Sequence, residues 1–104
     1  MKIELNIKDR LAIINMLPST GKLTYLVEVL DLIKLIKFTQ EENDKYSIKS
    51  DGNRIIWNIE LDSNKEFDLN IEQINIIKDQ IKKLDNEDKI DINIVETCLK
   101  FSKL

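Results

Sequence analysis

Residues 22–37 constrain the fold most, because a helix formed by them is apolar on nearly all sides. Their polar residues follow one another at spacings of four, three, three and three positions, and the residues between them are apolar: Thr24, Glu28, Asp31, Lys34 and Lys37. On a helix, this spacing gathers the polar side chains into one narrow stripe. The run is too short and too charged to span a bilayer. Such a helix must be covered by the rest of its domain or by a second molecule.

The remaining sequence predicts a mainly helical α+β fold in a single domain, residues 1–104. Apolar periodicity and capping residues predict four helices, at about residues 8–17, 22–37, 71–84 and 92–101, and a short helix near residues 40–45. The N-caps are Asn6, Asn70 and Asp91, and Thr39 with Glu42 forms a capping box.

The strand signals are short. Asp51 and Gly52 form a turn dipeptide between apolar alternations, so we expect a small β-hairpin over about residues 46–59. Residues 66–69 fit a short third strand beside it. Residues 1–7 also alternate with strand periodicity, directly before the Asn6 cap.

The other helices each offer one narrow apolar face, and the hairpin offers another through Ile55, Trp57 and Ile59. If these faces do not enclose the helix at residues 22–37, a two-fold pair covers the excess. We expect a homodimer with interface residues Tyr25, Val29, Leu32, Ile36 and Trp57; a monomer is the alternative. For Trp57 itself, packing of the hairpin onto the helices is the favoured interpretation over an interface anchor.

The side chains needed for ordinary catalysis are missing, so we expect no enzyme, no catalytic residues, no cofactor and no metal. Histidine is absent, and the only cysteine, Cys98, lies on an apolar helix face. A phosphate-binding loop at residues 18–22 and a calcium loop at residues 85–96 both lack required positions. Carboxylate pairs such as Glu41 and Glu42 lie in polar stretches and are interpreted as solvated charge. A carboxylate- and metal-dependent hydrolase or nuclease is the alternative class.

Charge and cysteine content limit the classes of binding partner and the cellular compartment that we expect. The net charge is −3 and the acidic residues are spread along the chain, which argues against nucleic acid as the partner. A winged helix-turn-helix would place its reading helix near residues 40–46, where acids outnumber lysine. The N-terminus does not resemble a signal peptide and the lone cysteine allows no internal disulfide, so we expect a cytoplasmic protein.

Several short motifs occur in the order of a known group: residues 9–11 (DRL), residues 17–18 (LP) with Gly21, residues 38–42 (FTQEE), residues 57–58 (WN), residues 83–85 (KLD) and residues 98–101 (CLKF). They resemble small phage and prophage accessory proteins that read ERL…LLP…G, FSEEE, W, KLD and YEKF. Cys98 and Leu99 depart from the last motif. The resemblance implies no enzymatic activity and no functional residues.

What the resemblance implies is a phage accessory protein in the host cytoplasm. Such proteins often bind and block a host component, including bacterial immune systems such as CRISPR. We therefore expect a non-enzymatic inhibitor of a host protein, for example an anti-CRISPR. A phage structural or assembly component, a DNA-binding regulator and an oligomeric sponge for signalling nucleotides are the alternatives.

Overall fold

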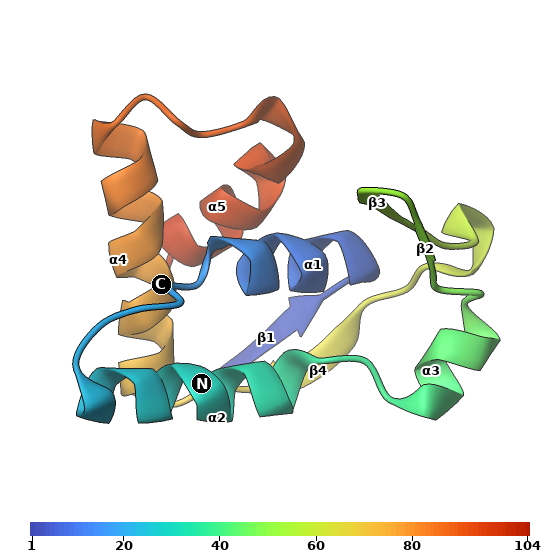
Figure 1. Ribbon diagram of the computed structural model, residues 1–104, viewed down its shortest axis with the longest axis horizontal. Helices are drawn as coiled ribbons and strands as arrows, with labels where there is room; N and C mark the ends of the chain where they lie inside the picture. The colour runs from blue at the N-terminus through green and yellow to red at the C-terminus, as the bar shows by residue number, and fades with distance from the viewer.

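Helices form most of the molecule, with two small antiparallel sheets beside them (Figure 1). The computed structural model describes residues 1–104. The elements are β1 (Lys2–Leu5), α1 (Ile7–Met16), α2 (Leu23–Ile36), α3 (Gln40–Lys45), β2 (Lys49–Asp51), β3 (Arg54–Ile56), the 3-10 turn η1 (Ile59–Leu61), β4 (Lys65–Asp68), α4 (Ile71–Asn86), the 3-10 turn η2 (Ile92–Ile94) and α5 (Val95–Ser102). The mainly helical α+β prediction is confirmed, except that η2 replaces the start of the last predicted helix.

Capping side chains begin three of the helices at the predicted positions. Asn6, Thr39 and Asn70 each accept a hydrogen bond from the backbone N–H three residues later, and a side chain at that position returns the bond. These reciprocal bonds satisfy backbone donors that a helix start leaves free. Asp91 instead caps η2, by accepting from the backbone N–H of Asn93 at 2.8 Å.

Two strands that lie far apart in the sequence, β1 and β4, form a two-stranded antiparallel ribbon. β1 pairs with β4, with Lys2 opposite Asp68 and Leu5 opposite Lys65. The expected third strand is therefore real, but it pairs with the N-terminal strand and not with the hairpin. This pairing buries Leu5 and Phe67 on the side that faces the helices.

One hydrophobic core lies between the ribbon and the helices. α1 occupies the centre, with α2 along one side, α4 along another and α5 on a third (Figure 1). The core residues come from all of these elements: Leu5, Ile13, Val29, Leu32, Ile36, Phe67, Leu69, Ile74, Ile76, Ile77 and Phe101. No helix combines the length and the apolar composition needed to cross a membrane.

The hairpin stands apart from this core. It projects at the upper right of Figure 1, and every residue of β2 and β3 is exposed. Gly52 takes φ +62°, which suits the first central position of a tight two-residue turn. Of the three apolar residues expected on the hairpin's inner face, Ile55 and Ile59 are 41% and 76% exposed, and only Trp57 is half-buried.

Candidate functional site

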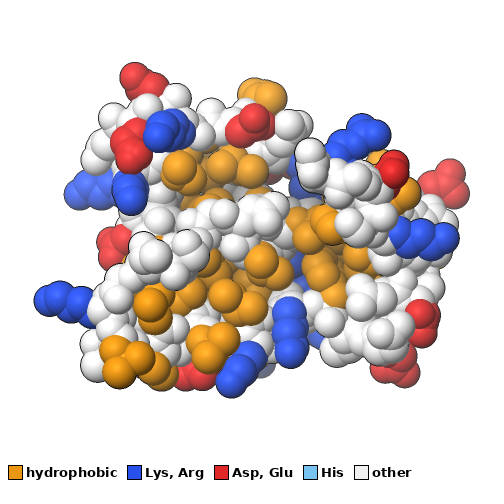
Figure 2. All heavy atoms as spheres, in the orientation of Figure 1, with side chains coloured by type: hydrophobic (Ala, Val, Ile, Leu, Met, Phe, Trp, Pro, Cys, Tyr) orange, Lys and Arg blue, Asp and Glu red, His pale blue; other side chains and the backbone are white.

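The outer side of α2 carries a row of exposed apolar side chains. Leu23, Val27 and Leu30 follow at spacings of four and three, so they lie on one helix face, and they are 79%, 49% and 50% exposed. We call these three residues the outer row. Figure 2 shows hydrophobic side chains along this lower left edge, over the first half of α2.

The inner side of the same helix carries most of the residues predicted for a dimer interface. Val29, Leu32 and Ile36 are at most 3% exposed and belong to the chain's own core. Tyr25 is half-buried and packs against that core. The prediction that these inner residues face a second copy is therefore corrected, because other elements of the same chain already cover them.

A second apolar surface lies on the segment from β2 to η1, residues 49–61, which we call the hairpin arm. Its exposed apolar side chains are Ile55, Ile56, Ile59 and Leu61. Trp57, the remaining predicted interface residue, is half-buried, and its indole Nε1 is buried without a hydrogen-bond partner. The arm is held at its base, where the backbone N–H of Asn58 donates to the carbonyl of Tyr46 at 2.8 Å.

Open hollows on two sides separate the hairpin arm from the body. One, of about 500 Å³, lies against Leu11 and Asn15 of α1; the other, of about 530 Å³, lies against α3. Ile55 lines both. The arm therefore presents its sides, as well as its tip, to other molecules.

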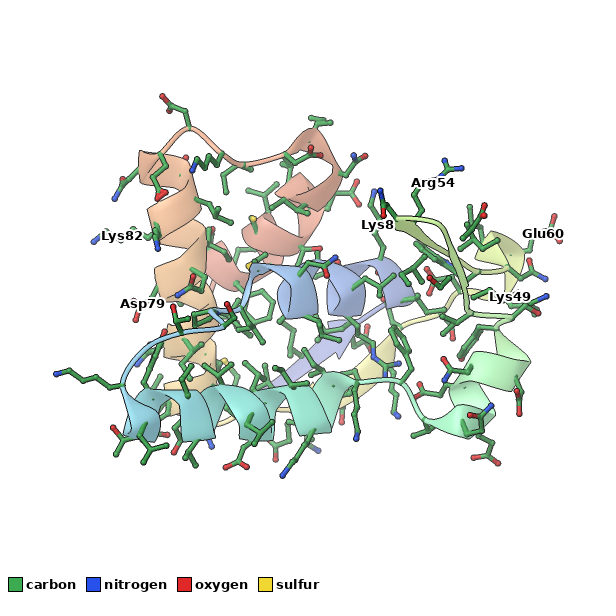
Figure 3. The ribbon with its side chains drawn as sticks, in the orientation of Figure 1. Lys8, Lys49, Arg54, Glu60, Asp79 and Lys82 are labelled. Carbon is green, nitrogen blue, oxygen red and sulfur yellow. The ribbon has the colours of Figure 1, made fainter.

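Unpaired cations surround the hairpin arm. Lys49 and Arg54 belong to the arm, and Lys8 lies on α1 one turn before Leu11, which lines the same hollow as Arg54 (Figure 3). None of the three forms an ion pair within the chain. The exposed acids Asp51 and Glu60 lie on the same arm, so the surface combines isoleucines with charges of both signs.

The chain's best-buried ion pair joins α1 to α3. Arg10 of α1 donates from Nη1 and Nη2 to the two carboxylate oxygens of Glu42, at 2.6 and 3.0 Å. Its Nε and Nη2 also donate to the carbonyls of Ile36 and Lys37, at 2.9 Å each, at the end of α2. The hydrogen bonds from Arg10 to the Glu42 carboxylate lower the pKa of Glu42 to about 2. The interpretation of Glu42 as solvated charge is therefore wrong.

Aromatic rings complete the setting of Arg10. Its guanidinium carbon lies 4.2 Å from the ring centre of Phe38 and 5.1 Å from that of Phe67, in cation–π geometry. Arg10, Phe38 and Glu42 belong to the first and third motifs of the phage resemblance, so these motifs meet in space. Sequence periodicity alone missed this cluster; the motifs were the only signal for it.

A second buried carboxylate, that of Asp9, is also hydrogen-bonded and ion-paired within the chain. Asp9 accepts a hydrogen bond from the Thr97 hydroxyl at 2.6 Å and is ion-paired with Lys100. It also closes the capping box of α1 with Asn6. Asp9 thus ties α1 to α5 and has no free oxygen facing a pocket.

The remaining reactive group is Cys98, which is buried. Burial and, second, the charge of Asp85 raise the pKa of its thiol. No three His, Cys, Asp or Glu side chains gather in a way that could hold a metal ion. Comparisons with protein-family models, curated proteins and solved structures found no match.

Proposed function

We propose that this protein is a non-enzymatic accessory protein of the phage type, which binds and inhibits a host protein in the host cytoplasm. The resemblance of its motifs to phage accessory proteins supplies the class, and an immune effector such as a CRISPR protein is the kind of target that it implies. In this proposal the protein acts as a homodimer.

The observation that carries the proposal is the hairpin arm. Ile55, Ile56 and Ile59 are exposed on a segment that projects from the body. The β2–β3 sheet has two strands, so each strand has one edge without a neighbour. An open strand edge beside apolar side chains is a common peptide- and protein-binding surface.

The charges on the arm suit a protein partner with a polar rim of both signs. Lys49, Asp51, Arg54 and Glu60 are exposed on the arm and form no ion pair within the chain. The chain as a whole carries −3, so these cations are a local feature and not a nucleic-acid footprint. An apolar centre with a charged rim is the usual composition of a protein interface.

The setting of the reactive groups supports a role without catalysis. Glu42 has a pKa of about 2 because of Arg10, so it stays ionised and paired at neutral pH. Asp9 is bonded to Thr97 and Lys100. A general acid or base needs a free group that titrates near the working pH.

The experiment is an interference assay in host cells with an active CRISPR system. Expression of the wild-type protein should raise phage plating efficiency at least 10-fold, and Ile55→Asp with Ile56→Asp should abolish the gain. Ile92→Asp is the matched control, because Ile92 is 83% exposed and lies on η2, outside the arm. The captured partner should be identified from host lysate with the same three proteins. Capture of only DNA or only virion proteins, or equal capture by the hairpin variant, would contradict the proposal.

A further inference from the structure

We propose that Asp62 is a positioning residue for the hairpin arm: its carboxylate is hydrogen-bonded at the N-terminus of α1 and holds the arm at a fixed angle to the body. The inference rests on the proposed function, in which the arm binds the target, and deepens it. It gives Asp62 a part in binding without any contact between Asp62 and the target.

Residues 49–64, which contain the arm, have a single hydrogen bond to the elements that form the core. Asp62 directly follows η1, and its Oδ1 accepts from the backbone N–H of Ile7, the first residue of α1, at 3.0 Å. In Figure 1 the N-terminal end of α1 points toward the arm. Residues 49–64 form no ion pair. The bond between Asp62 and Ile7 is therefore the polar tie between the arm and the body.

The other hydrogen bonds that leave this segment lead to Tyr46, which lies between α3 and β2. The backbone N–H of Asn58 donates to the Tyr46 carbonyl at 2.8 Å, and the Ser63 hydroxyl lies 3.3 Å from the Tyr46 hydroxyl. Both bonds join the two legs of the arm to each other. Trp57 is half-buried and adds apolar contact, which is non-directional, and its Nε1 has no hydrogen-bond partner. Asp62 thus supplies the directional contact to α1.

The backbone N–H of Ile7 needs the Asp62 carboxylate as its partner. The first N–H groups of a helix have no acceptor within the helix, and the Asn6 side chain accepts from Asp9, not from Ile7. Ile7 is 2% exposed, so release of Asp62 would leave a buried donor unsatisfied. A negative charge is also favourable at the N-terminus of a helix. These terms keep the tie closed in the folded protein.

A fixed angle matters because the arm stands beside hollows on two sides. Ile55 lines both hollows, and Leu11 of α1 lines one of them. An arm that turned into a hollow would bury Ile55 against the body and hide it from a target. The tie keeps the arm in its projecting position, so little conformational freedom is lost when a target binds.

Residual dipolar couplings, measured by NMR on the isotope-labelled full chain, test the tie. In the wild type, the couplings of the arm amides should fit the same alignment tensor as those of the helices. In Asp62→Ala the helix couplings should stay unchanged and the arm couplings should fall to about half or less, because the arm then moves relative to the body. Asp62→Asn keeps an oxygen that accepts from the Ile7 N–H, so it should restore the wild-type couplings.

Asp91→Ala is the matched control. Asp91 also accepts from a backbone N–H, that of Asn93 at 2.8 Å, but it caps η2, outside the arm. The arm couplings of this variant should equal those of the wild type. An equal fall of the arm couplings in Asp62→Ala and Asp91→Ala would show a general loosening of the chain and overturn the inference.

The interference assay adds a readout of the arm's position. Asp62→Ala should lower the gain in plating efficiency by about 3-fold or more, although the isoleucines of the arm are unchanged, and Asp62→Asn should keep the gain. Three results would overturn the inference: wild-type arm couplings in Asp62→Ala, a mobile arm in Asp62→Asn, or a mobile arm in Asp62→Ala with the full gain. If the wild type gives no gain, the proposed function fails, and the couplings still decide whether Asp62 holds the arm.

Discussion

Glu42→Gln tests what holds α3 against α1. Glutamine keeps a carbonyl oxygen for the Thr39 backbone N–H, which Glu42 Oε1 now accepts at 3.1 Å, so the capping box survives. The change removes only the negative charge that faces Arg10. The Arg10 side chain is 2% exposed, so its guanidinium would remain buried without a counter-ion. Leaving one member of a buried pair behind is strongly destabilising.

The pKa of Glu42 gives the magnitude. Hydrogen bonds from Arg10 lower this pKa from 4.5 to about 2, and one pKa unit corresponds to about 1.36 kcal/mol, so the upper bound is about 3 kcal/mol. The Glu42 side chain is 14% exposed, so solvent screening reduces the expected loss to about 2 kcal/mol. For a domain of this size, such a loss lowers Tm by roughly 10 °C.

Urea unfolding followed by circular dichroism measures the loss. Glu41→Gln is the matched control, because Glu41 also lies in the first turn of α3 but is exposed and unpaired; it should cost less than about 0.5 kcal/mol. The folded pKa of Glu42 lies below the unfolded one, so the stabilisation is complete above about pH 4.5 and is lost as the pH falls toward 2. The difference between wild type and Glu42→Gln should therefore be constant from about pH 6 to 8 and shrink below pH 4.5. Equal urea midpoints for the two Gln variants at pH 7 would refute the reasoning.

Three further predictions follow from burial. Leu32→Ala should lower the free energy of unfolding by about 2 to 5 kcal/mol in urea, because Leu32 is fully buried, whereas Leu30→Ala should cost less than about 1 kcal/mol. Thr97→Val should cost about 1 to 3 kcal/mol in the same assay, because it removes the buried hydroxyl that donates to Asp9; a value near zero would mean that this bond adds little. Cys98 should react with a thiol-specific chromogenic reagent at pH 7 far more slowly in the folded than in the urea-unfolded protein, because burial raises its pKa and hides it; equal rates would contradict this setting.

The helices could be predicted from the sequence because their signals are local. Asn6, Thr39 and Asn70 each bond the residue three positions later, so the sequence itself shows where these capping boxes form. The hairpin turn at Gly52 is local as well, since a two-residue turn joins neighbouring strands.

The ribbon and the ionic cluster could not be predicted in the same way, because their partners are distant in sequence. β1 pairs with β4 across about 60 residues, and the periodicity of one strand does not identify which other strand it pairs with. Arg10 and Glu42 each resemble ordinary surface charges. They are buried only because α1 and the end of α2 bring a guanidinium, two free carbonyls and a carboxylate to one place.

The apolar excess of α2 was predictable, but its rotation about the helix axis was not. A helix that is apolar on nearly all sides fits a core equally well through several faces, so composition cannot decide between Val29 and Val27 as the core residue. In the structure the core takes Val29, Leu32 and Ile36, and the excess remains on the outer row. The two rows should therefore respond differently to the same substitution. Leu32→Glu should unfold the protein because it buries a charge in the core, and Leu30→Glu should change the free energy of unfolding by less than about 1 kcal/mol in urea. Equal losses of stability in the two variants would mean that α2 does not divide its faces in this way.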